Sequence, residues 1–147
     1  MLTTAQERKI SLLSDTILYD EAVTLMRRIS PLPTSQIMGL LNNTRVSSYG
    51  QLYAYIIHQR DRNWQDSKQG TKVFYTELEK VLSQMRKKRA IEEFRLLTPG
   101  LNSQQANLEA DEVMAALSRE FIQHLVAENN LRAELQRAQA PAQRNRR

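Results

Sequence analysis

The sequence contains no cysteine, and its 147 residues include only four glycines and four prolines. Without thiols the chain has no disulfide, thiolate metal site or cysteine nucleophile, which excludes a small secreted fold held by disulfides. Many-stranded sheets and glycine-rich phosphate loops need more glycine. The longest apolar run, Leu52 to Ile57, is far shorter than the about 20 residues of a membrane span. The first residues lack the order of a signal peptide, so we expect a soluble, cytoplasmic protein.

Residues suited to catalysis are also scarce. The two histidines, His58 and His124, lie far apart in the sequence. A general base needs a nucleophile and an orienting partner within reach, and the residues around His58 supply neither. The acidic pairs Glu92–Glu93 and Asp111–Glu112 are sequence neighbours, which point in different directions on a helix. We therefore predict that the protein is not an enzyme and binds no metal or other cofactor.

Apolar residues with helical spacing fill most of the chain. Thr4 followed by Glu7 has the pattern of a capping box, and the helix that it opens is predicted to continue to Ile29, in one piece or two. Pro31 and Pro33 end this first helical region, because each proline disfavours helix in the residue before it. The first quarter of the chain is therefore predicted to be helical.

The middle of the chain reads as three more helices. A short helix is predicted over 34–41, followed by a turn at 42–44 and by a helix that begins at Ser47 or Ser48. The polar stretch 60–70 is predicted to be a loop, and a longer helix begins near Thr71. In that helix the apolar stripe loses its phase at the run Arg86–Lys87–Lys88–Arg89. We expect a break or kink there, because two stripes out of phase cannot face one core.

The C-terminal part predicts one further long helix. Glu109, Asp111 and Glu112 are placed in its opening turn, where carboxylates complement the positive end of the helix dipole. The whole pattern predicts an all-α protein, a compact bundle of five to six helices. Residues 1–140 are assigned to a single helical-bundle domain, and residues 141–147 to a basic tail that we expect to be mobile.

Positive charge is the most informative feature of the sequence. Between Arg45 and Arg95 there are eleven basic and six acidic residues, an excess equal to the net charge of +5 of the whole chain. Phosphates spaced along a nucleic acid are natural partners for such a segment, because each contact releases counterions and adds affinity without base specificity. The residues predicted to bind nucleic acid are Arg27, Arg28, Arg60, Arg62, Lys68, Lys72, Arg86, Lys87, Lys88 and Arg89.

Two other interpretations of these residues stay open. The run that ends at Arg89 can instead complement the C-terminal dipole of its helix as a solvated cap. Tyr49 and Tyr53 are predicted to belong to the core, whereas Tyr55 and Trp64 lie beside arginines in polar surroundings and are left open as partners that stack on bases.

A different kind of DNA-binding protein is the main alternative. The segment 34–60 reads as helix, short turn and helix, and Ser47, Ser48 and Gln51 are the polar residues that could read base edges from the second helix. Such a helix-turn-helix transcriptional regulator would bind duplex DNA alone, prefer one sequence and dimerise. A third possibility is a protein adaptor whose charges are only solvated.

The chain resembles the small subunits of multi-protein, Cascade-like CRISPR effector complexes. The likeness lies in a basic, cysteine-free, all-helical chain of this length, in the phrase Thr34–Ser35–Gln36–Ile37 that opens a helix, and in the helix from Phe74 to Met85 that ends in basic residues. It looks most like the type I-D version, which is made by internal initiation within the large-subunit gene and matches the C-terminal helical domain of that subunit.

This resemblance implies an architectural role in antiviral defence. Several copies would stack along the guide-RNA filament, touch other effector subunits and each other, and hold a target or displaced DNA strand through phosphates, while base pairing carries the sequence specificity. The expected function is thus that of a non-catalytic structural subunit that stabilises guide RNA and target DNA in the R-loop.

Overall fold

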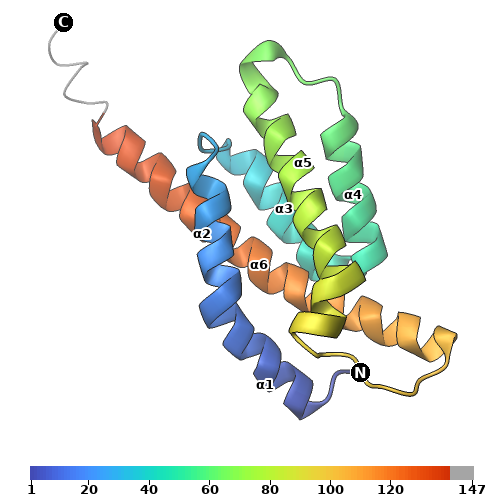
Figure 1. Cartoon of the computed structure of the whole chain (residues 1–147). Coiled ribbons are helices and arrows are strands. Elements are labelled where there is room, and N and C mark those ends of the chain that lie inside the picture. The colour runs from blue at the N-terminus through green and yellow to red at the C-terminus, as the bar shows by residue number, and fades with distance from the viewer. Residues whose placement is uncertain (140–147) are drawn as a thin grey trace, which may run out of the picture.

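The computed structural model describes residues 1–139, and these form five helical segments with no strand among them (Figure 1). The all-α bundle predicted from the sequence is confirmed. The predicted basic tail, residues 141–147, lies outside the described residues. No helix in the described part of the chain is long and apolar enough to cross a membrane.

The first segment is one continuous rod made of α1 (Thr4–Leu13), the π-helical turn η1 (Ser14–Leu18) and α2 (Tyr19–Arg27). A capping box opens it, one residue earlier than predicted. The Thr3 hydroxyl accepts from the backbone N–H of Gln6 at 3.1 Å, and the Gln6 side chain accepts from the Thr3 N–H at 2.9 Å. The predicted pairing of Thr4 with Glu7 is therefore wrong.

The π-helical turn η1 follows from the spacing of the buried residues. Ile10, Ser14, Leu18 and Ala22 are all buried and recur at every fourth position. In a regular α-helix each such step overshoots a full turn by about 40°, so the stripe would wind away from the core. A turn with i to i+5 hydrogen bonds is wider, and it keeps these side chains on one face.

The helices α3 (Thr34–Val46) and α4 (Tyr49–Asp61) are joined by only two residues. Ser48 caps α4 in a box with Gln51, as the sequence predicts for a start at Ser47 or Ser48. The turn predicted at 42–44 is wrong, because α3 continues through it. Its polar side chains bond within the helix: Asn43 donates to the Gly39 carbonyl at 2.9 Å, and Thr44 donates to the Leu41 carbonyl at 2.6 Å.

The next segment is a short 3-10 turn η2 (Asp66–Lys68), then α5 (Gln69–Gln84) and the π-helix η3 (Met85–Glu93). The phase break predicted at the basic run is this π-helix. Buried residues from Phe74 to Met85 recur at spacings of three to four, whereas the next one, Ala90, comes five positions after Met85, which a π turn accommodates. The segment closes at Arg95, whose φ of 52° is left-handed, and the Leu96 N–H donates to the Ala90 carbonyl at 2.9 Å.

The last helix, α6 (Ser103–Gln139), is 37 residues long and crosses behind the other helices (Figure 1). It packs on α2, α3, α4 and η3. Asn102 precedes it and accepts from the Gln105 N–H at 2.8 Å. Because α6 begins six residues before Glu109, the prediction that the acidic residues occupy its opening turn is wrong. Glu109 instead accepts from the backbone N–H and the hydroxyl of Thr98, both at 2.6 Å.

Candidate nucleic-acid interface

The ten residues predicted to bind nucleic acid form three groups on the fold. Arg27 and Arg28 lie at the C-terminal end of α2. The hairpin group, Arg60, Arg62, Lys68 and Lys72, lies where α4 turns into α5. The π-helix group, Arg86, Lys87, Lys88 and Arg89, lies at the other end of α5. Along that rod Lys72 and Arg86 are about 20 Å apart. The ten residues are therefore spread over three separate groups on the fold.

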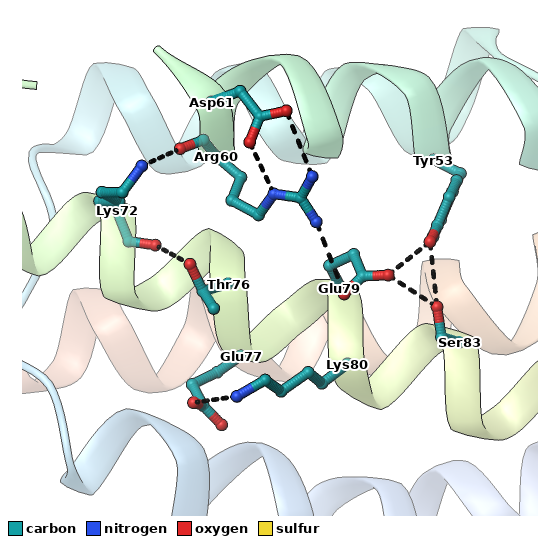
Figure 2. A network of polar contacts seen from close by, with 9 residues as sticks. All are labelled: Tyr53, Arg60, Asp61, Lys72, Thr76, Glu77, Glu79, Lys80 and Ser83. Atoms are coloured by element: carbon teal, nitrogen blue, oxygen red, sulfur yellow. Dashed lines mark hydrogen bonds and ion pairs between the residues drawn. The ribbon is translucent and has the colours of Figure 1, made fainter. Parts of the chain in front are cut away.

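Within the hairpin group, Arg60 is held by carboxylates (Figure 2). Its Nε lies 2.8 Å from an oxygen of Asp61, and its guanidinium lies 3.8 Å from Glu79. The hydrogen bond from Arg60 lowers the pKa of Asp61. Lys72 donates to the backbone carbonyl of Arg60 at 2.9 Å, which ties the start of α5 to the end of α4. The charge of Arg60 is thus balanced by carboxylates, whereas the Lys72 ammonium bonds a backbone carbonyl and no carboxylate in residues 1–139.

The same end of the molecule carries the one tryptophan of the chain. Trp64 is half-buried, and its indole N–H donates to the carbonyl of Gln59 at 2.7 Å. The guanidinium of Arg62 lies 4.5 Å from the ring centroid and also donates to the Gln59 side chain at 3.0 Å. One face of the indole is therefore covered by Arg62. A base could stack on that face only after Arg62 moves.

The π-helix group divides into two paired and two unpaired residues. Arg86 bonds Asp111 of α6 at 3.0 Å, and Arg89 bonds Glu21 of α2 and Glu93, both at 2.7 Å. Lys87 and Lys88 are exposed and have no carboxylate within 4 Å in residues 1–139. Arg86 and Arg89 therefore serve the fold as ion-pair partners, a role that the sequence did not predict for them.

Most of the ten cations nevertheless stay unpaired. Only Arg60, Arg86 and Arg89 lie within 4 Å of a carboxylate in the described part of the chain. Six of the other seven side chains are exposed, and Lys72 is half-buried. The seven cations without a carboxylate partner in residues 1–139 are Arg27, Arg28, Arg62, Lys68, Lys72, Lys87 and Lys88.

A cleft of about 340 Å³ adjoins the π-helix group. Sequence reasoning missed it, because its walls come from three helices that meet only in the fold. Its lining residues are Tyr49, Gly50, Tyr53, Ser83, Arg86, Lys87 and Asp111.

The two tyrosines at this cleft differ in their surroundings. Tyr49 is buried, as predicted, and its burial raises its pKa to about 12, so the phenol stays neutral. Tyr53 is only half-buried and packs against the core. Its hydroxyl donates to Glu79, and Ser83 lies 3.0 Å from it and donates to the same carboxylate at 2.8 Å (Figure 2). These bonds between α4 and α5 fix one wall of the cleft.

The residues suggested for a helix-turn-helix interface have other roles. The Ser48 hydroxyl accepts from the Gln51 N–H at 3.2 Å, and the Gln51 side chain accepts from the Ser48 N–H at 3.0 Å. Two of the three side chains proposed to read bases are thereby used to cap α4. This geometry gives the regulator alternative less support than the short α3–α4 link suggests.

Among residues 1–139 no three histidine or acidic side chains lie close enough together to hold a metal ion. No family model, curated protein or solved structure matches the chain.

Proposed function

We propose that the protein is a non-catalytic subunit that holds the phosphate backbone of a nucleic acid within a larger assembly. The observation that carries this proposal is the set of seven basic side chains without a carboxylate partner in residues 1–139. Unpaired exposed cations attract a polyanion and release its counterions on contact. The proposed assembly is an RNA-guided CRISPR effector complex, because the chain resembles the small subunits of such complexes in the phrase Thr34–Ile37 and in the basic residues that follow α5. Its partners would be the other subunits of that complex and further copies of this chain.

The spacing of the groups suits one strand whose phosphates keep the spacing of a stacked duplex. The hairpin group and the π-helix group are about 20 Å apart along α5, and consecutive phosphates on one strand of a duplex are about 3.4 Å apart along the axis. About six nucleotides therefore separate contacts to the two groups. An oligonucleotide of about twelve nucleotides is long enough to reach both.

The test is a salt titration of binding to a labelled twelve-nucleotide single strand, followed by fluorescence anisotropy. We expect weak binding that is indifferent to sequence. The double variants Lys87→Gln/Lys88→Gln and Arg62→Gln/Lys68→Gln should each reduce the slope of log K against log salt by about 1.4, since each lost phosphate contact removes about 0.7 on a single strand. Trp64 emission should change on binding, because the indole lies against Arg62 of the hairpin group.

The matched control is Arg8→Gln/Arg119→Gln, which removes two exposed positive charges from α1 and α6, outside the three groups. It should leave the slope unchanged. If the control flattens the slope as much as the two test variants do, binding follows net charge and the proposed groups are refuted. No binding at any salt concentration supports the adaptor. A strong preference for one duplex sequence supports the helix-turn-helix regulator.

A further inference from the structure

We propose that the cleft beside the π-helix takes one unpaired nucleobase of the bound strand. This inference deepens the proposed function and rests on it. The cleft has a volume of about 340 Å³, within the range of sites for small ligands. Its lining includes the side chains of Tyr49 and Tyr53 from α4 and of Arg86 and Lys87 from η3, whose rings and aliphatic stems offer an apolar surface to a flat aromatic group.

Two tyrosines of α4 form an aromatic wall of the cleft. Tyr49 and Tyr53 are one turn apart on α4, and their ring centroids are 5.9 Å apart. Tyr53 is fixed at its hydroxyl by Glu79 and Ser83, so its ring needs no ordering when a base arrives. Stacking on an aromatic side chain tolerates any base, because every base has a π-face. A base in this cleft would therefore be held without strong sequence selection.

Positive charge beside the cleft favours a nucleic acid strand as its ligand. Lys87 lines the cleft and is also one of the unpaired cations proposed to bind phosphate, and Lys88 follows it. A strand whose phosphates contact these lysines carries its bases to the mouth of the cleft. The carboxylate of Glu79 is engaged by Tyr53 and Ser83, and that of Asp111 is paired with Arg86 at 3.0 Å. Neither carboxylate is left unpaired beside the phosphates.

The pair Arg86–Asp111 adds polar groups at the edge of the cleft. The Arg86 guanidinium lies 5.9 Å from the centroid of the Tyr49 ring, and the Asp111 side chain is half exposed. The guanidinium can donate to a base carbonyl, and the carboxylate can accept from an exocyclic amine. Cytosine and guanine carry both groups, so a cytosine strand is a suitable probe.

Gly50 provides a way to fill the cleft without changing its charges. This residue lines the cleft within α4, and a Cβ at this position would have its nearest neighbour, the Ser48 hydroxyl, at 4.0 Å. Gly50→Leu therefore puts an aliphatic side chain into the space proposed for the base. Gly50→Ala is the matched control, since it shares the gain in helix propensity and adds only one methyl group. Both variants should melt no lower than the wild type.

The experiment compares a twelve-nucleotide cytosine strand with an abasic strand of the same length and charge. The wild type and Gly50→Ala should bind the cytosine strand about tenfold more tightly, the contribution of one stacked base. Gly50→Leu should bind both strands equally, with the salt slope of the wild type. Equal binding of both strands by the wild type overturns the base site but leaves phosphate binding standing. A base preference that survives in Gly50→Leu also overturns it. Failure to bind either strand refutes the proposed function itself.

Discussion

The guanidinium of Arg89 donates to both carboxylate oxygens of Glu21, each at 2.7 Å, across 68 positions of the sequence. It also bonds Glu93, one turn further along its own segment. The hydrogen bonds to Glu93 and Glu21 raise the pKa of Arg89 further above its ordinary value. A bidentate pair of this kind fixes geometry as well as charge. Arg89 therefore holds the π-helix η3 against α2. Nothing in the local sequence distinguishes it from the three basic residues that precede it.

Arg89→Gln is expected to weaken the fold rather than nucleic-acid binding. The side chain is only 20% exposed, so its loss leaves Glu21 partly desolvated without its cation. We expect the free energy of unfolding to fall by about 1 to 2 kcal/mol, measured by urea denaturation. Lys88→Gln is the opposite case, with unchanged stability and weaker binding. If Arg89→Gln lowers affinity as much as Lys88→Gln and leaves stability intact, Arg89 binds phosphate.

The contrast between Arg89 and Lys88 shows what local sequence can reveal. The phase change at the basic run was predictable, because the loss of apolar periodicity after Met85 is a local pattern of the sequence. The sequence could not predict which cations of the run meet a carboxylate, because Glu21 and Asp111 approach the run only when three helices pack together. The same holds for the cleft beside Tyr53. Long-range packing sets these features, and one sequence carries no signal for them.

The helix boundaries show a second limit. Ser48 was recognisable as a cap, because serine followed three residues later by glutamine is a local signal. The true start of α6 was missed because Asn102 and Gln105 cap it in a polar stretch without apolar periodicity. The acidic residues from Glu109 onward resembled a first turn but contact other elements instead. Composition near a helix end therefore misleads when a carboxylate has a tertiary partner.

Acid should destabilise the protein through glutamates that are bound in the fold. Hydrogen bonds from Tyr53 and Ser83 lower the pKa of Glu79, and the bond from Arg89 lowers that of Glu93, both below the ordinary 4.5. Burial opposes the shift at Glu109, but bonds from Thr98 outweigh it and its pKa is lowered as well. The folded chain thus binds these protons more weakly than the unfolded chain.

The stability that these three glutamates contribute is complete above a pH of about 5. It is lost as the pH falls below the ordinary glutamate pKa of 4.5 and through the lowered pKa values of the folded chain. Glu79→Gln keeps an acceptor for Tyr53 but cannot titrate, so its free energy of unfolding should fall less steeply between about pH 5 and pH 3. The measurement is a series of urea denaturation curves over this range. Glu92→Gln is the control, because Glu92 is exposed and has no ion pair in residues 1–139. Parallel curves for the wild type and Glu79→Gln would contradict the prediction.

Asn129 should be one of the most sensitive positions in the chain. Its side chain is fully buried in α6, where it accepts from the Leu32 N–H at 2.7 Å and donates to the Leu32 carbonyl at 3.1 Å. Asn129 thereby supplies the hydrogen-bond partners for the N–H and the carbonyl of Leu32, which lies in the connector between α2 and α3. Asn129→Ala leaves two buried backbone groups unpaired and should cost about 2 to 5 kcal/mol of unfolding free energy.

The control for Asn129 is Asn130→Ala, a change of the same chemistry at the adjacent, half-buried position. Its cost should stay below about 1 kcal/mol. Asn129→Asp tests the donated hydrogen bond separately. The carboxylate can still accept from the Leu32 N–H, but it cannot donate to the Leu32 carbonyl. The substitution also places a negative charge in a buried position. We expect this variant to be at least as unstable as Asn129→Ala at neutral pH. A mild effect of both Asn129 variants would show that the connector is held in another way.

Ser118 is expected to behave in the opposite way to Asn129: replacing its side chain should stabilise the fold. Its side chain is fully buried in α6, and its hydroxyl has no hydrogen-bond partner within the described residues. Ser118→Ala removes this unsatisfied group and also favours the helix, so the free energy of unfolding should rise by about 1 kcal/mol. Ser11→Ala, at an exposed position of α1, measures helix propensity alone and should give a smaller gain. The difference between the two variants isolates the burial penalty, and a loss of stability in Ser118→Ala would mean that the hydroxyl has a partner in solution.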